Sequence, residues 1–348
     1  MNDKKADIIA VAKAARVSAS TVSRSFNHPD LVKASTRKKI DNAVRRLGYI
    51  RNRAAQTIHG IRSGTVGLIV PTVDHAIFAE LIQSFSEAIE ELGFTILLAS
   101  HGYDLQREYV LTRKMLEHRV DGMALIGIEH EDETFGLLHS QNVPTVLLWN
   151  YSETSRFPSV GSDNFQAGWL VGHHIGQLNH TRVAGLFPPL TGNDRAKQRR
   201  EGVEAALAEF NVRIPDIWDI ETPYSVGAAK DAVTQLVSEG DLPTAIICGN
   251  DVLAWGALHA LSKEGLSVPR DISVTGIGDF KGSRDFEPAL TTVRIPARQI
   301  GAKAAKTIAT KITASEVDVT SELVIPDLLL RQTSSAPNAN GMPRNHSL

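Results

Sequence analysis

The chain has 348 residues, of which 42% are hydrophobic and 22% are charged, and its formal net charge is −2. These values are ordinary for a water-soluble protein of two or three domains, and the single cysteine, Cys248, excludes an internal disulfide. No apolar run approaches membrane-spanning length, and the opening segment MNDKKADII lacks the apolar core of a signal peptide. The sequence therefore favours a cytoplasmic protein with no membrane partner.

Charge is divided unevenly along the chain. Residues 1–64 carry 14 Lys and Arg against 4 Asp and Glu, a balance of +10, whereas the remainder carries 23 against 35, a balance of −12. A basic segment joined to an acidic one is typical of a nucleic-acid-binding module attached to a domain that does not bind nucleic acid. The alternative is a solvated, basic helical domain with no role in DNA binding.

The first predicted elements are three short helices within residues 8–49. Ser18 is a suitable N-cap for the second helix, in which Val22 and Phe26 are expected to point inward. The outward positions of that helix are small, hydroxylated or cationic: Ala19, Ser20, Ser23 and Arg24. Such a face can enter the major groove of DNA and contact phosphates and base edges.

From residue 65 onward, short apolar strands alternate with segments of helical periodicity. Strands are predicted at 65–71, 94–100, 120–128 and 143–149, with helices at 78–93, 106–118 and 131–141. The pattern repeats with strands at 182–188, 216–221, 244–250 and 272–278, and helices near 164–178, 195–211, 226–239 and 251–264. Segments 291–296 and 322–332 are predicted to contain crossover strands. Continuously apolar strands indicate parallel sheets covered on both faces, so we expect two Rossmann-like α/β subdomains facing each other across a cleft.

Parallel sheets bind ligands beyond the carboxyl ends of their strands, so the polar and aromatic residues that follow each strand are candidate ligand contacts. These residues are Asp74, His75, Phe78, Ser100, His101, Trp149, Asn150, Asp163, Arg195, Arg199, Asn250 and Asp251. For most of them the alternative is a helix cap or a surface polar group, and Asn250 with Asp251 before a predicted helix is an example.

Sequence patterns for catalysis are weak. The segment GIGDFKG (276–282) follows a strand, but it lacks the helix and the later acidic residue of a dinucleotide site. The sequence contains no phosphate-binding glycine loop, no nucleophile elbow and no histidine pattern with metal-ligand spacing. We therefore expect no enzyme activity, no metal and no cofactor. A transport binding protein would share the paired subdomains, but it would carry a signal peptide and no basic helical segment.

The segments VAKAARVSASTVSRSFN, TRKKIDNAVRRLGY and NRAAQTIHG resemble the N-terminal part of the lactose-repressor (LacI/GalR) family of bacterial regulators, and the similarity extends to about Ser335. The resemblance implies that the second helix reads the major groove and that a hinge helix, Asn52 to His59 with Gly60 as its stop, inserts Ile58 into the minor groove. The implied DNA contacts are Ser18, Ala19, Ser20, Thr21, Ser23, Arg24, Asn27, Asn52, Ala55, Gln56 and Ile58.

Two positions depart from the family pattern in this segment. Arg16 stands where the family usually has a turn glycine, and a left-handed backbone there would cost roughly 1 kcal/mol relative to glycine. Lys33 replaces the usual hydroxyl cap of the third helix, so we expect Ser35 or Thr36 to cap it one register later.

The resemblance also bears on the ligand. Arg199, in the segment RREG, matches an arginine that usually grips effector oxygens, whereas Gly278 and Trp149 replace two carboxylates of sugar-binding relatives. Thr222 occupies a usual stacking position, with Tyr224 close by. The resemblance implies an effector site made of Asp74, His75, Phe78, Trp149, Asn150, Asp163, Arg195, Arg199, Tyr224, Asn250 and Asp279. A cationic cleft with fewer carboxylates favours a sugar acid or other carboxylate, as in a gluconate-repressor-like branch.

The resemblance implies a homodimeric repressor of catabolic genes that binds pseudo-palindromic operator DNA and is released by a small-molecule inducer. A corepressor scheme and dual activation and repression remain alternatives. The expected organisation is a helix-turn-helix DNA-binding domain (1–51), a hinge helix and linker (52–63), a periplasmic-binding-protein-like effector and dimerisation domain (64–335) and a disordered tail (336–348). Within the effector domain, subdomain 1 takes 64–163 and 294–324, and subdomain 2 takes 164–293 and 325–335.

Overall fold

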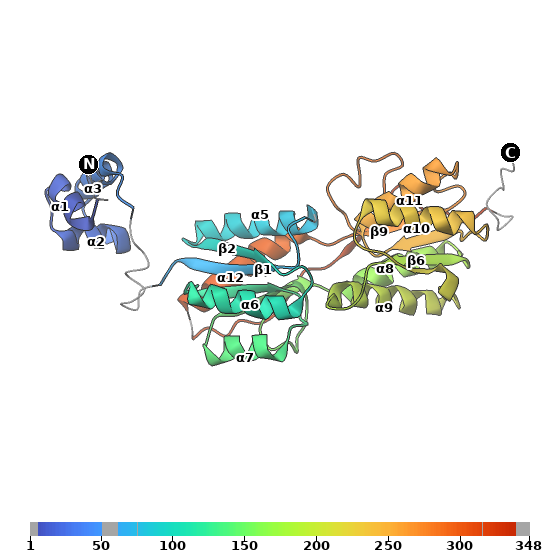
Figure 1. Cartoon of the computed structure of the whole chain (residues 1–348), viewed down its shortest axis with the longest axis horizontal. Helices are drawn as coiled ribbons and strands as arrows, with labels where there is room; N and C mark the ends of the chain where they lie inside the picture. Colours follow the sequence, from blue (N-terminus) through green and yellow to red (C-terminus); the bar gives the residue numbers. More distant parts are fainter. Residues whose placement is uncertain (1–5, 51–61, 75, 315, 339–348) are drawn as a thin grey trace. The chain divides into compact units, whose positions relative to one another are not determined.

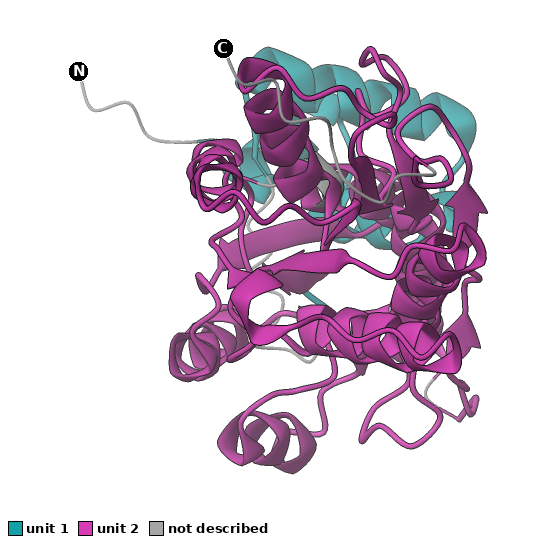
Figure 2. Ribbon diagram, turned by 90° about the vertical axis from the view of Figure 1, so that its right-hand side faces the viewer, with its two compact units in different colours: residues 1–63 teal, residues 64–348 magenta. Residues whose placement is uncertain are grey.

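The computed structural model describes residues 6–50, 62–74, 76–314 and 316–338. The chain forms two compact units, Met1–Ser63 and Gly64–Leu348 (Figure 2). The predicted hinge helix, with Asn52, Ala55, Gln56 and Ile58, lies outside the described residues, as do His75 and residues 339–348 of the predicted tail. No helix within the described ranges is both long and apolar enough to cross a membrane.

The first unit contains the three predicted helices, α1 (Ile8–Ala15), α2 (Ala19–Asn27) and α3 (Ala34–Leu47), with a 3-10 turn at Pro29–Leu31. The side chains of Val11, Val22 and Ile40, one from each helix, are fully buried against one another and form its small core. Ser18 is the N-cap of α2, as predicted, because its Oγ accepts the backbone N–H of Thr21 at 3.1 Å.

The structure shows the local consequence of the two sequence departures, Arg16 and Lys33. Arg16 adopts φ 60° and ψ 46°, so the turn is left-handed and the residue bears the strain expected of a side chain there. The prediction of a later cap for α3 is wrong. The helix begins at Ala34 because the Lys33 carbonyl already accepts the N–H groups of Thr36 and Arg37, which places Ser35 and Thr36 inside the first turn.

The second unit has two six-stranded sheets, each with helices on both faces (Figure 1). The first sheet has the order β11-β5-β4-β3-β1-β2, with all of its strands parallel. Its strands are β1 (Thr65–Val70), β2 (Thr95–Ser100), β3 (Gly122–Ile126), β4 (Thr145–Asn150), β5 (Ser159–Ser162) and β11 (Glu322–Leu323). Its helices are α5 (Ala76–Glu91) and α12 (Ala297–Thr313) on one face, and α6 (Leu105–Glu117) and α7 (Asp132–Ser140) on the other. We call this half lobe 1.

The second sheet has the order β12-β10-β9-β8-β6-β7, in which β12 alone among its described strands is antiparallel. Its strands are β6 (Val183–Phe187), β7 (Asp219–Glu221), β8 (Ala245–Cys248), β9 (Ser273–Gly278), β10 (Thr291–Arg294) and β12 (Asp327–Leu329). Helices α8 (Asn164–Gln177) and α9 (Asp194–Glu209) cover one face, and α10 (Val226–Ser238) and α11 (Asp251–Lys263) cover the other. A 3-10 turn at Asp216–Trp218 precedes β7. We call this half lobe 2.

The paired α/β architecture is as predicted, with three differences. Strand β2, expected to be buried, is the edge strand of its sheet and leaves Leu98 exposed, because the chain places no further strand beside it. Helix α12 and strand β5 were not predicted. Helix α12 belongs to lobe 1 although β10, immediately before it, belongs to lobe 2, and its buried face includes Ile300, Ala304 and Ile308.

Candidate functional site

The outward face of α2 presents the predicted DNA-contacting residues of the first unit. Ser18, Ser20 and Arg24 are exposed, and the remaining members, Ala19, Thr21, Ser23 and Asn27, are partly exposed. Ser18 Oγ lies 2.8 Å from both Ser20 Oγ and Thr21 Oγ1, so the three hydroxyls form one cluster at the start of the helix. Because Val22 is buried behind this face, the helix can present hydroxyl and guanidinium groups to a nucleic acid without losing its own packing.

In the second unit, Trp149 and Asn150 end strand β4 at the boundary between the lobes. The Trp149 ring is buried 5.3 Å from the ring of Phe78, and the residue has φ 81°. Asn150 Nδ2 donates to Gln198 Oε1 of lobe 2 at 3.0 Å. Within the described part of the chain, Trp149 Nε1 and Asn150 Oδ1 are buried without a hydrogen-bond partner. One donor and one acceptor from the same strand end therefore have capacity for a ligand.

Two arginines approach from helix α9 of lobe 2. Arg195 Nη1 donates to Asp194 Oδ1 at 2.8 Å, while its buried Nη2 has no hydrogen-bond partner among the described residues. Arg199 Nε donates to Asn164 Oδ1 at 2.9 Å and its Nη1 to the Gly249 carbonyl at 3.2 Å. Burial lowers the pKa of Arg199, yet an arginine stays charged at neutral pH. Arg195 is thus the residue with a buried guanidinium nitrogen left for an anion.

His101 adds a further polar group from the end of β2. The ring is 2% exposed, its Nε2 lies 3.7 Å from Glu108 Oε2, and neither ring nitrogen has a hydrogen-bond partner among the described residues. Burial lowers the pKa of His101, Glu108 opposes this shift by a smaller amount and Arg195 adds to it, so the ring is neutral at neutral pH. A neutral imidazole offers one donor and one acceptor, which suits a hydroxyl group.

Other expected effector residues have structural partners. Asp163 caps α8 by accepting the N–H of Gln166 at 2.9 Å, and Asn250 caps α11 by accepting the N–H of Leu253 at 3.0 Å. The two oxygens of Asp279 accept from Arg294 at 2.9 Å and from Arg331 at 2.5 Å. These contacts favour the helix-cap or structural interpretation for the three side chains. Asp74 is exposed.

Two tyrosines lie at the lobe boundary, Tyr103 from lobe 1 and Tyr224 from lobe 2. Tyr103, which the sequence interpretation omitted, has its ring 6.2 Å from that of Tyr224 and 6.0 Å from the Arg195 guanidinium carbon. Burial raises the pKa of Tyr103, which keeps its hydroxyl protonated. Tyr224 OH accepts from Asn193 Nδ2 at 3.4 Å. A strand-end position two residues beyond His101 could have suggested Tyr103.

A carboxylate side chain at position 278 would be sterically hindered. Gly278 has φ 141°, and a Cβ atom there would lie 2.0 Å from Cε1 of Phe280. An aspartate at this position would therefore require Phe280 to move. A separate cavity of about 470 Å³ is lined by Trp255, His259 and Phe286 and shares no residue with this set. Among the described residues, no group of three or more His, Cys, Asp or Glu side chains could hold a metal ion.

Comparison with known proteins gives matches over nearly the whole chain. Residues 63–333 match the model for periplasmic binding proteins and the sugar-binding domain of the LacI family, and residues 7–52 match the model for bacterial regulatory proteins of the lacI family. The HTH-type transcriptional repressor PurR of Klebsiella pneumoniae is 29% identical over 325 residues, which cover 93% of this chain and 95% of that protein. PurR of Photorhabdus laumondii is 28% identical over the same length, with the same shares covered.

Solved structures agree with these matches. The lac repressor dimer bound to operator and the anti-inducer ONPF is 26% identical with a TM-score of 0.84, and the alignment covers 96% of this chain and 100% of that one. The transcription regulator GntR from Chromobacterium violaceum is 27% identical with a TM-score of 0.73, covering 78% of this chain and 99% of that one.

Proposed function

The chain belongs to the LacI family of bacterial regulatory proteins, and we propose that it represses catabolic genes until a hydroxylated carboxylate, such as a sugar acid, binds between its lobes. It is a DNA-binding transcriptional repressor with an effector-binding domain. The proposal adds the chemistry of the effector and the direction of its effect. We retain 1–51 as the DNA-binding domain, 52–63 as the hinge and 64–335 as the effector domain.

The proposed DNA-bound form is a symmetric homodimer on a pseudo-palindromic operator. The lac repressor relative is described as a dimer bound to operator, and its likeness to this chain extends over both units. The first unit supplies the positive charge for DNA binding. The rest of the chain has a balance of −12 and is not attracted electrostatically to DNA phosphates. Deleting residues 1–60 should therefore abolish operator binding and leave a folded dimer, and retention of binding by the truncated protein would contradict the assignment.

The observation that carries the effector class is the set of buried polar atoms at the lobe boundary that have no hydrogen-bond partner among the described residues. Arg195 Nη2 and Trp149 Nε1 are donors, and a carboxylate can accept from both. Asn150 Oδ1 is an acceptor and His101 offers one acceptor, so both suit hydroxyl groups. Because buried polar groups are costly when unpaired, a ligand with a carboxylate next to hydroxyls would satisfy all four.

A neutral sugar fits this set less well. It would give the buried Nη2 of Arg195 only a neutral acceptor, and Gly278 removes a carboxylate that would otherwise clamp hydroxyls. The rest of the predicted effector set, including Arg199 and Tyr224, is retained as lining, while Asp163, Asn250 and Asp279 are proposed to act structurally. The match to a regulator named GntR is compatible with the gluconate-repressor-like branch, which remains a prediction.

The test is direct ligand binding by the full-length protein. Titration calorimetry should give tighter binding for D-gluconate, galactonate or glucuronate than for glucose or galactose, and Arg195→Ala should remove that preference. Arg213→Ala, on the segment after α9, is the matched control and should leave it intact. A neutral hexose that binds tightest, with affinity unchanged in Arg195→Ala, would reject the effector class and leave the family assignment standing.

Corepression is the second candidate for how the ligand changes operator affinity. The PurR relatives are named only as repressors, so their names do not distinguish release by a ligand from recruitment by one. Operator binding measured with and without the ligand separates the two, because an inducer lowers operator affinity whereas a corepressor raises it.

A further inference from the structure

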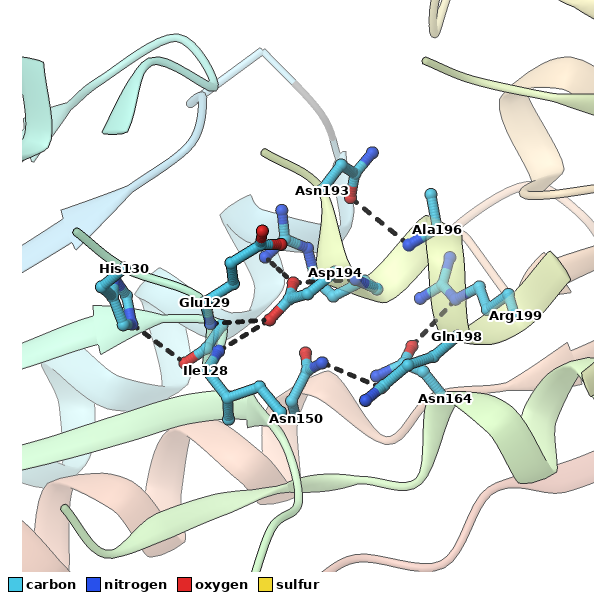
Figure 3. Close-up of polar contacts among 12 residues, drawn as sticks. Ile128, Glu129, His130, Asn150, Asn164, Asn193, Asp194, Ala196, Gln198 and Arg199 are labelled. Atoms are coloured by element: carbon cyan, nitrogen blue, oxygen red, sulfur yellow. Dashed lines mark hydrogen bonds and ion pairs between the residues drawn. The ribbon is translucent and has the colours of Figure 1, made fainter. Parts of the chain in front are cut away.

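Asp194 joins the two lobes through a single buried carboxylate. It is the first residue of α9, and its side chain is almost fully buried. Its Oδ2 accepts the backbone N–H groups of Ile128 at 2.7 Å and Glu129 at 3.2 Å, both from the loop after β3 in lobe 1 (Figure 3). Hydrogen bonds to a carboxylate that is shielded from water are strong, so this is a specific attachment between the lobes.

The other oxygen of the same carboxylate fixes Arg195. Asp194 Oδ1 accepts both the backbone N–H and the Nη1 of Arg195, each at 2.8 Å. Four N–H groups therefore surround one carboxylate, two from each lobe. The ion pair also sets the direction of the guanidinium, because Nη1 is held by Asp194 while Nη2 stays without a partner in the described structure.

Gly127 allows the lobes to approach this closely. Its φ is 101°, a left-handed conformation that favours glycine. A Cβ atom on Gly127 would lie 2.8 Å from Arg195 Nη1 and 3.0 Å from Asp194 Oδ2. A larger residue would therefore be strained at this φ and would displace the Arg195 guanidinium and the Asp194 carboxylate from these positions.

The loop whose N–H groups bind Asp194 is itself held by hydrogen bonds within lobe 1. His130 Nε2 lies 3.2 Å from the Gly127 carbonyl and must donate to it, since a carbonyl oxygen can only accept. His130 Nδ1 lies 2.6 Å from Glu108 Oε1, which is a hydrogen bond between two buried groups. These hydrogen bonds hold residues 127–130 with their N–H groups available to Asp194.

We propose that Asp194 is a positioning residue that couples effector binding to closure of the lobes, because one carboxylate both orients Arg195 toward the ligand and fastens lobe 2 to the 127–130 loop. The orienting role rests on the proposed function, whereas the fastening role does not. A ligand carboxylate meets Arg195 Nη2 in this direction only while Asp194, which orients Arg195, is held at the 127–130 loop. Ligand binding and closure thus favour each other.

The test measures the distance between the lobes in the full-length protein. Spin labels are placed at the exposed positions Glu133→Cys on α7 and Ala208→Cys on α9, and Cys248 does not interfere because it is fully buried. Without ligand, Asp194→Asn should add a longer-distance population that the parent protein lacks, and Gly127→Ala should do the same. Glu201→Gln removes a carboxylate from the exposed side of α9 and should leave the distribution unchanged.

The second measurement uses D-gluconate and D-glucose as probes. Asp194→Asn should weaken gluconate binding about tenfold and glucose binding clearly less, because more open lobes affect both ligands whereas a misplaced Arg195 penalises the anion alone. Identical distance distributions for Asp194→Asn, Gly127→Ala and the parent would overturn the fastening role. Equal losses for both ligands would overturn the orienting role. If gluconate does not bind the parent protein, the proposed effector class fails, and the ligand-free distances still decide whether Asp194 fastens the lobes.

Discussion

Asn150 at the end of β4 donates from Nδ2 to Gln198 Oε1 on α9 at 3.0 Å, which makes this pair a second polar link between the lobes. The side-chain oxygen of the same amide, Asn150 Oδ1, is buried and has no hydrogen-bond partner among the described residues. Gln198 therefore fixes the orientation of an amide whose other end is proposed to meet the effector. The pair gives a test of preorganisation separate from the Asp194 carboxylate.

Gln198→Ala should weaken effector binding about two- to tenfold, because one hydrogen bond contributes about 0.5–1.5 kcal/mol and the amide would lose its fixed orientation. Titration calorimetry with D-gluconate measures the change. Gln235→Ala removes an exposed amide from α10 and serves as the control. If the Gln198 and Gln235 variants bind with the same affinity, the amide link does not prepare the site.

Arg24→Ala should cost about 1–3 kcal/mol of operator binding and relax the preference at one base position, because an exposed guanidinium on α2 can pair with a base edge. Competition against a library of operator variants measures the loss position by position. Arg45→Ala, on α3, removes the same charge and should weaken all sequences alike. A uniform loss for Arg24→Ala would reduce its role to a phosphate contact.

Arg16→Gly should stabilise the first unit by up to about 1 kcal/mol, since glycine adopts the left-handed conformation at φ 60° without the clash of a Cβ atom. The greater freedom of glycine in the unfolded chain offsets part of this gain. Amide hydrogen exchange of α1 to α3 in the full-length protein gives the opening free energy. Slower exchange is expected, and faster exchange would show that Arg16 makes contacts whose loss outweighs the strain.

Stability of the second unit should fall as the pH drops below about 6.5. Burial lowers the pKa values of His101, His174 and His180 from their ordinary value of 6.5. Below that value the unfolded chain takes up protons that the folded chain does not, so the free energy of unfolding decreases until the lowered folded pKa values are reached. Urea unfolding at pH 7.5 and 5.5 measures the difference.

His180→Gln is the informative variant for this pH effect. The histidine Nε2 lies 2.8 Å from the Ser335 carbonyl, and a glutamine amide can replace that donor without titrating. The variant should therefore lose less stability between pH 7.5 and 5.5 than the parent protein. His118→Gln changes an exposed histidine at the end of α6 and should keep the parent difference. An unchanged difference in His180→Gln would assign the acid sensitivity to other groups.

The sequence predicted those features that depend on neighbours along the chain. Ser18 as a cap, Val22 as a core residue and the apolar strands follow from local patterns, and the structure has each of them. Burial of β2 was predicted wrongly because Ile96, Leu97 and Leu98 look alike in a central or an edge strand, and strand order is not local. Helix α12 was missed between two predicted strands, although Ile300, Ala304 and Ile308 recur on one face at helical spacing.

The candidate site was likewise predictable where it depends on local sequence and unpredictable where it depends on distant parts of the chain. Positions after strand ends were predictable, and Trp149, Asn150 and Arg195 lie at the lobe boundary. The partners of these residues were not predictable. Asp194 resembles an ordinary acidic residue in the first turn of a helix, and its contact with Ile128 links positions 66 residues apart. Asp279 was expected to face a ligand, but its contacts with Arg294 and Arg331 arise only when β10 and the segment after β12 come together.

We propose that an acid effector releases this repressor from its operator. The most direct measurement is fluorescence anisotropy of an operator, selected from random DNA by the full-length protein, titrated with D-gluconate and with D-glucose. We predict that gluconate lowers operator affinity at least tenfold, that glucose does not, and that Arg195→Ala stays bound to the operator with either ligand. Tighter operator binding with gluconate would replace release by corepression, and release by glucose that persists in Arg195→Ala would contradict the proposed recognition of an acid.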